Sequence, residues 1–198
     1  MEIDIIINHL KEMLLDRGDN IDEFEEHEVD IDRDEFYSDN LIEFHTSNTT
    51  IIFALTKTLR RNILKDASDD IIKFAEKYNN KPNIILIFNN DTNSTPVVQQ
   101  LNKYDKILQK QGGSLQYFHI KNLLFNPTKH FLVPKHIKLS PEEATEVMDK
   151  YLVKKNQMPY ILHTDVIAKW LGLKHGDIVK IERLNENSGI SYYYRVCI

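Results

Sequence analysis

Two histidines that bracket a proline-containing run are the side chains best placed for chemistry in this 198-residue chain. In an extended run, His130 and His136 would point to the same face. Two imidazoles on one face could begin a metal site, but no nearby cysteine or third histidine completes it. We therefore predict that these rings hydrogen-bond to backbone or to a binding partner, because imidazole can donate and accept at once.

The sequence patterns behind most common catalytic chemistry are absent. No Asp or Glu is followed two positions later by Lys, the arrangement with which restriction-type nucleases hold metal and orient water. The chain also has no Gly-x-x-x-x-Gly-Lys-Ser/Thr phosphate loop, no Cys-x-x-Cys pair and no Gly-x-Ser-x-Gly elbow. We therefore predict no catalytic residue, no metal, no cofactor and no small-molecule substrate.

A basic cluster offers a different chemistry, contact with phosphate. Four cations recur at helical spacing: Lys57, Arg60, Arg61 and Lys65. The simplest interpretation is an exposed helix face, with a DNA-backbone contact as the alternative. A predicted helix also begins at Pro96, where free backbone N–H groups favour phosphate. The residues predicted to lie nearest to DNA are Thr95, Pro96, Lys57 and Arg60.

Local signals predict the elements around the two histidines. Pro134 biases Val133 away from helical conformations, so we expect the run 130–136 to be extended. Apolar residues on both faces of this run suggest backbone that is buried between partners. A helix should follow directly, because Ser140 and Glu143 can form a capping box and Pro141 fits the first helical position.

The run resembles the signature of subunit 5, the small subunit shared by eukaryotic nuclear RNA polymerases, which also has an archaeal relative. The residues that fit this family pattern are His130, Leu132, Val133, Pro134, His136, Leu139 and Glu142. Phe131 departs from it, since a smaller or polar residue is more usual there. Further similar blocks follow in order at 158–161, 165–183 and 187–195, with departures at Val166 and Asn185.

The resemblance is weaker but present before residue 128, at 14–18, 95–99 and 124–130, with departures at Val97 and Val98. Eukaryotic members of the family carry an N-terminal jaw domain that archaeal members lack, and this chain has a domain of that size. The resemblance therefore implies an α/β N-terminal jaw domain at 1–128. It also implies a small α+β C-terminal assembly domain at 129–198.

The same resemblance implies the partners. The C-terminal domain would anchor to the largest polymerase subunit, in contact with other subunits, while the jaw would lie beside downstream DNA. Catalysis, and the magnesium it uses, would belong to the two large subunits. The residues expected to bind the partner are His130, Val133, Pro134, His136, Leu139, Arg183, Gly189, Tyr194 and Arg195.

Charge is unevenly distributed along the chain. Residues 1–128 contain 14 Lys and Arg against 22 Asp and Glu, a net charge of −8, whereas residues 129–198 carry a net charge of +3. An acidic domain repels phosphate, so we expect DNA contact only in the assembled enzyme. The acids crowded at 19–39 are interpreted as solvated surface rather than a metal site.

Hydropathy, the first residues and the cysteine content further limit the class of protein. No apolar run approaches the roughly 20 residues that a membrane helix needs, so we predict no membrane association. The first residues lack the basic region of a signal peptide. A single cysteine, Cys197, fits a reducing compartment.

Hydrophobic periodicity predicts helices at 3–17, 69–78, 97–110, 140–151 and 164–171. Strands are predicted at 41–45, 50–55, 83–88, 115–120, 177–184 and 190–198. Gly18 should cap the first helix, and a turn at 187–189 should join the last two strands. Trp170 should lie in the core. Along 192–195 we expect one core face and one face that is either exposed or stacked on a partner.

Two other functions stay open. A free-standing adaptor or DNA-binding module could reuse the assembly domain, whereas a degenerate or metal-dependent nuclease is disfavoured by the missing acid-x-lysine pair. The abundance of Ile, Asn and Lys, with the departures from the family pattern, makes a large DNA virus an alternative source to a cell. The expected location is the nucleus if the protein is cellular, and the virion or cytoplasmic viral factory if it is viral.

Overall fold

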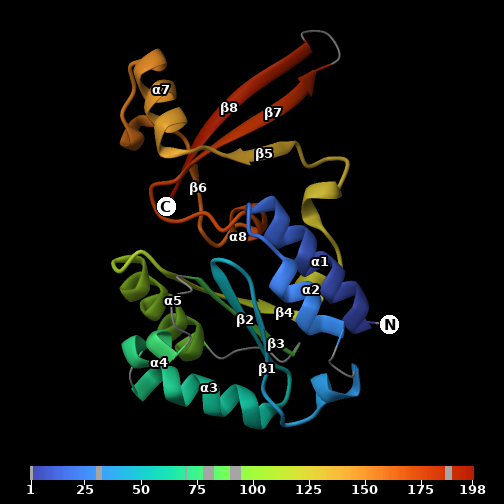
Figure 1. Cartoon of the computed structure of the whole chain (residues 1–198). Coiled ribbons are helices and arrows are strands. Elements are labelled where there is room, and N and C mark those ends of the chain that lie inside the picture. The colour runs from blue at the N-terminus through green and yellow to red at the C-terminus, as the bar shows by residue number, and fades with distance from the viewer. Residues whose placement is uncertain (1, 30–32, 70, 78–82, 90–94, 186–188) are drawn as a thin grey trace. The chain divides into compact units, whose positions relative to one another are not determined.

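The computed structural model describes residues 2–29, 33–69, 71–77, 83–89, 95–185 and 189–198 (Figure 1). The chain divides into two compact units, Met1–Phe125 and Asn126–Ile198. The boundary expected near residue 128 falls inside a short 3-10 helix, η2 (Pro127–Lys129). The side chain of Asn126, the first residue of the second unit, caps η2 by accepting a hydrogen bond from the Thr128 N–H at 2.9 Å.

A four-stranded sheet with the order β1-β2-β3-β4 forms the centre of the first unit. β1 (Ile42–His45) pairs antiparallel with β2 (Thr49–Ala54). β3 (Asn83–Phe88) and β4 (Ser114–His119) continue the sheet in parallel. β2 is buried at every position and β3 at all but its first, as expected of strands covered on both faces.

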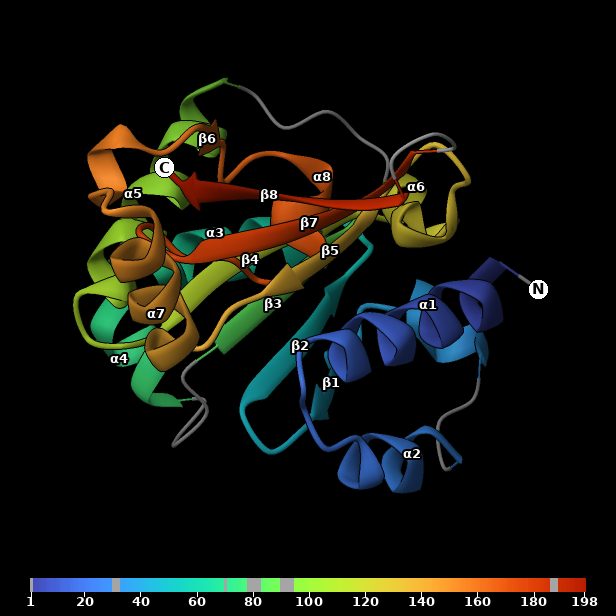
Figure 2. The same ribbon diagram turned by 90° about the horizontal axis from the view of Figure 1, so that it is seen from above.

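Helices cover the two faces of this sheet (Figures 1 and 2). One side carries α1 (Glu2–Asp16) and α2 (Asp22–Val29), and the other carries α3 (Lys57–Asp69), α4 (Ile71–Lys77) and α5 (Thr95–Gln109). The side chains of α3, α4 and α5 pack on alternate residues of β2 and β3, including Ile52 and Leu86. Aromatic rings fill the opposite side, where Phe24 and Phe44 stack at 4.5 Å.

The remaining elements of the first unit are short. They are the 3-10 helix η1 (Arg33–Tyr37) and helix α6 (Ile120–Leu123). Ile120, predicted to end a strand, begins α6 instead. Gly18 follows α1 with φ of +80°, which confirms the predicted glycine cap. The helix predicted at 97–110 begins earlier, at Thr95, and its approach at 90–94 lies outside the described residues.

The second unit is a sheet with the order β5-β7-β8-β6. Its strands are β5 (Lys135–Lys138), β6 (Tyr160–Ile161), β7 (Ile178–Asn185) and β8 (Gly189–Cys197). β7 and β8 form the predicted hairpin, closing at the pair Asn185–Gly189, while residues 186–188 lie outside the described part. β6 is only two residues long and was not predicted from the sequence. It pairs parallel with the end of β8.

Three helical segments complete this unit: α7 (Pro141–Tyr151), η3 (Lys155–Gln157) and α8 (Val166–Trp170). Its core joins α7 to the sheet through Leu139, Ala144, Met158, Ile178 and Val196. Trp170 is only 2% exposed, which confirms its predicted place in the core.

The two ends of α7 differ in their backbone chemistry. At its start the predicted capping box is confirmed, because Ser140 Oγ accepts from the Glu143 N–H at 3.2 Å and Glu143 Oε2 accepts from the Ser140 N–H at 2.8 Å. At its end Leu152 adopts the left-handed conformation, with φ of 52° and ψ of 41°. This region is uncommon for residues other than glycine, and the Leu152 side chain is 90% exposed.

The one cysteine lies at the end of β8, where Cys197 is fully buried. Burial, together with the carboxylate of Asp177, raises the pKa of the Cys197 thiol to about 11. Among the helices that the structure describes, none has the length and apolar character needed to cross a membrane.

Candidate interaction surface of the C-terminal unit

The residues 130–134 form a turn, so the predicted extended run is wrong for this segment. The Val133 N–H donates to the His130 carbonyl at 2.8 Å, and the Leu132 N–H donates to His130 Nδ1 at 3.3 Å. Pro134 disfavours helical conformations at Val133, but it does not prevent a turn at the preceding residues, where the His130 side chain supplies a local acceptor. Only Lys135–Lys138 continue as strand β5.

This turn exposes apolar side chains instead of burying the backbone between two faces. Phe131 is 88% exposed and Leu132 is 72% exposed. Leaving two large hydrophobic side chains in water has a free-energy cost that a partner surface would remove. The turn is therefore the first candidate for contact with another molecule.

The two histidines have opposite hydrogen-bond roles. His130 Nδ1 accepts, whereas His136 Nδ1 donates to the Pro134 carbonyl at 2.6 Å. His136 is half-buried, and this burial lowers its pKa, with the guanidinium groups of Arg195 and Arg183 acting in the same direction. The hydrogen bond to Pro134 and the carboxylate of Asp165 oppose the shift. In the described residues, no group of three or more His, Cys, Asp and Glu could hold a metal ion.

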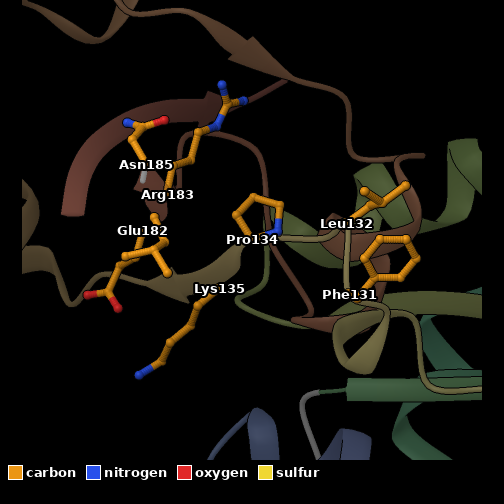
Figure 3. Close-up of a pocket in the computed structure, with 8 residues that line it drawn as sticks. Phe131, Leu132, Pro134, Lys135, Glu182, Arg183 and Asn185 are labelled. Carbon is orange, nitrogen blue, oxygen red and sulfur yellow. The ribbon is translucent and has the colours of Figure 1, made fainter. Parts of the chain in front are cut away.

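A groove with a volume of about 470 Å³ separates this turn from the far end of β7 (Figure 3). We call it the β7 groove. Its first wall comes from the turn and the start of β5, through Phe131, Leu132, Pro134 and Lys135. Its second wall comes from β7, through Glu182, Arg183, Leu184 and Asn185. Figure 3 shows Pro134 between the labelled β7 residues on one side and Phe131 and Leu132 on the other.

The polar groups around the β7 groove are not equally available. Glu182 is paired with Lys180 at 3.1 Å, and the Lys180 ammonium also lies 4.2 Å from the centre of the Tyr192 ring. The Arg183 guanidinium lies 4.6 Å from the centre of the Tyr193 ring. Stacking on an aromatic ring leaves the N–H groups at the edge of a guanidinium free to bind an anion.

The other predicted partner-binding residues are spread across the sheet. Leu139 is buried in the core of the unit, so its side chain holds the fold rather than the surface. Gly189 closes the hairpin with φ of +73°, and Arg195 Nη1 donates to the Tyr160 carbonyl at 3.4 Å. Tyr194 packs beside the core, with its ring 5.7 Å from that of Tyr151.

The predicted division of 192–195 into a core face and an open face is wrong in part. Tyr192 and Tyr193, on opposite faces, are both about half exposed, and burial becomes complete only at Val196 and Cys197. The core lies under one end of the β7–β8 hairpin, so the other end has no covering layer among the described residues.

Sequence reasoning missed several exposed apolar residues of this unit: Leu152, Leu162, Val166, Leu184 and Ile190. Leu184 and Ile190 face each other across the hairpin. The sequence feature that could have revealed Leu184 and Ile190 is the alternation of apolar residues along both strands, which continues beyond the last buried position. Alternation cannot reveal where the layer that covers a strand ends.

The residues predicted to lie nearest to DNA share one edge of the first unit's sheet. Adjacent parallel strands end at the same edge, so α3 after β2 and α5 after β3 both begin there. Lys57 is exposed at the start of α3 with Arg60 one turn on, and Thr95 and Pro96 are exposed at the start of α5. Positions predicted from separate motifs therefore lie at the same edge of the sheet.

Comparisons with known proteins agree with this division of the chain. The model of the family described as RNA polymerase Rpb5, C-terminal domain, matches residues 125–197. DNA-directed RNA polymerase subunit Rpo5 of Pyrococcus horikoshii is 45% identical over 74 residues, which is 37% of this chain and 90% of that relative.

A eukaryotic relative matches a longer stretch. The DNA-directed RNA polymerases I, II, and III subunit rpabc1 of Dictyostelium discoideum is 39% identical over 106 residues, 54% of this chain. The match spans 53% of that relative's length. The resemblance seen in the sequence signature is thus confirmed over a compact unit with its own core and an exposed apolar surface, and the chain belongs to the RNA polymerase Rpb5 family.

Proposed function

We propose that this chain is a non-catalytic structural subunit of a multisubunit DNA-directed RNA polymerase. Its C-terminal unit would anchor to the largest subunit, and catalysis with its magnesium would belong to the two large subunits. The observation that carries the proposal is the coincidence of the family match at 125–197 with the compact unit Asn126–Ile198. What is shared with the polymerase subunits is therefore a whole folding unit.

The distribution of exposed apolar residues supports an anchoring role for this unit. Twelve of the seventeen large hydrophobic side chains that are exposed in the described residues belong to Asn126–Ile198, little more than a third of the chain. Such a concentration on one small domain is typical of a surface that is covered in an assembly.

For the first unit we propose the role of a jaw beside downstream DNA. The edge where α3 and α5 begin presents Lys57, Arg60, Thr95 and Pro96. A net charge of −8 over residues 1–128 opposes DNA binding by the isolated chain, so contact requires the large subunits to hold DNA within reach. In a cell the assembly would lie in the nucleus; for a viral protein it would lie in the virion or viral factory.

Purification of the tagged full-length chain from its source tests the function. We expect the polymerase subunits to co-purify with it, the largest included. The free chain should neither cleave DNA nor hydrolyse nucleotides with magnesium. A free-standing adaptor or DNA-binding module would instead purify without large subunits and bind DNA tightly at raised salt, an outcome that would overturn the proposal.

The jaw role has a separate test in assembled polymerase. Changing Lys57 and Arg60 to Glu should weaken the grip on downstream DNA and lower the salt dependence by about one unit for each phosphate that is no longer bound. The control reverses Lys106 and Lys110, exposed cations in the second half of α5 and just beyond it, and should change little. Equal effects of the two pairs of substitutions would show that only net charge matters. The proposal of a specific DNA contact at this edge of the sheet would then be wrong.

A further inference from the structure

We propose that the β7 groove receives an extended segment of the largest subunit that carries an apolar side chain next to a carboxylate. The inference rests on the proposed function, since it assumes assembly with that subunit, and it adds the place and the chemistry of the contact. Three independent features of the described residues support it.

The first feature is the apolar surface. The four most exposed large hydrophobic side chains of the described residues are Leu152 at 90%, Phe131 at 88%, Leu184 at 81% and Leu132 at 72%. Three of these line the β7 groove from both of its walls. Apolar side chains gathered around a concave site are the usual arrangement of a binding hot spot, where a partner side chain is removed from water.

The second feature is charge. Of the three ionisable groups in the groove, Glu182 is neutralised by Lys180, which leaves Lys135 and Arg183 as the cations available to a partner. Neither has a carboxylate within ion-pair distance among the described residues. A carboxylate bound by Arg183 could accept two parallel N–H hydrogen bonds, a geometry that lysine cannot supply.

The third feature is the backbone. β5 covers β7 only as far as the pair Lys135–Glu182, whereas β7 continues to Asn185. The edge of 183–185 that faces away from β8 therefore has no neighbouring strand in the described part of the chain. Extended segments bind to such edges by main-chain pairing, with alternate side chains entering adjacent pockets.

These features favour protein over nucleic acid as the occupant. Phosphate would suit Lys135 and Arg183, but it gives no reason for Phe131, Leu132 and Leu184 to surround them in water. An apolar side chain with a neighbouring carboxylate satisfies both sets of groups at once.

The test measures affinity of the full-length chain for the co-expressed largest subunit. Leu184→Asp, and separately Lys135→Glu with Arg183→Glu, should each weaken binding about tenfold or more. Arg183→Lys should weaken binding less than these changes, because lysine keeps the positive charge and loses only the paired hydrogen bonds. Lys150→Glu with Lys154→Glu, exposed cations outside the groove, is the matched control and should change affinity by less than about threefold.

The occupant is then identified by a photo-crosslinking amino acid at position 184 in the assembled polymerase. We expect a crosslink to a peptide of the largest subunit that holds Asp or Glu next to an aliphatic or aromatic residue. Unchanged affinity of the groove variants in a chain that still assembles would overturn this inference alone, as would a crosslink to DNA or to a peptide without acids. Failure of the wild-type chain to bind would overturn the proposed function as well.

Discussion

Leu152 shows how a single residue can oppose the stability of the element it ends. The left-handed conformation brings the Cβ atom of Leu152 unfavourably close to the backbone. The side chain is 90% exposed, so its burial contributes almost nothing to stability. We expect Leu152→Gly to raise the free energy of unfolding by about 0.5–1 kcal/mol in chemical denaturation. Leu152→Ala, which keeps Cβ, is the control and should give no such gain. A loss of stability in the glycine variant would mean that the leucine packs against the unit.

The half-buried ring of His136 makes the stability of the second unit depend on pH. Since burial lowers the pKa of His136 in the folded state, the unfolded chain takes up a proton first as the pH falls. Stability should therefore be complete above about pH 6.5, the usual histidine pKa, and should decrease below it. Thermal unfolding between about pH 7 and pH 5.5 should show this decrease, and His136→Gln should reduce the slope. An unchanged slope in that variant would assign the effect to other groups.

At the scale of elements, the sequence predicted what local chemistry decides. The capping box of α7, the glycine after α1 and the aliphatic strands of the first sheet are specified by residues close in the chain. The turn at 130–134 and the parallel pairing of β6 were not predicted. The turn depends on the side-chain orientation of His130, whose Nδ1 accepts from the Leu132 N–H. The pairing of β6 depends on contacts with the end of β8, which is distant in the sequence.

The same limit applies to the candidate surface. The family pattern pointed to residues 130–136 and to the hairpin, but it placed Leu139 on the surface and did not include Leu184. Both are apolar residues at strand ends. Only the position of α7 over one end of the sheet decides that the first is buried and the second is exposed.

The capping box of α7 provides a prediction at this scale. Ser140→Ala removes the acceptor for the Glu143 N–H and should lower the free energy of unfolding by about 1 kcal/mol. Ser140→Asp keeps an acceptor and should remain close to the wild type in the same urea titration. Equal losses in both variants would show that the hydroxyl has another role.

At the scale of the whole molecule, the second unit should fold without the first. Its core of Leu139, Ala144, Met158, Ile178 and Val196 lies entirely within it. The archaeal relative matches this chain over 74 residues, 90% of its own length, which is about the size of this unit. We expect residues 126–198, expressed alone, to unfold cooperatively by circular dichroism. A fragment without a cooperative transition would show that the core needs the first unit.

A matched variant in the full-length chain separates the two units further. Ile178→Ala opens a cavity in the core of the second unit and should cost about 2–5 kcal/mol there. The first unit has its own core around Ile52 and Leu86, so its transition should be retained. Simultaneous loss of both transitions would contradict independent folding.

The burial of Cys197 has a practical consequence for spectroscopy. With a pKa of about 11, only about one thiol in ten thousand is ionised at pH 7, and the fully buried sulfur is shielded from reagents. Maleimide dyes should therefore leave the native chain almost unlabelled. A cysteine introduced at exposed position 184 would then be the one reactive thiol, with no need to replace the original. Dye emission from that position could follow subunit assembly in real time.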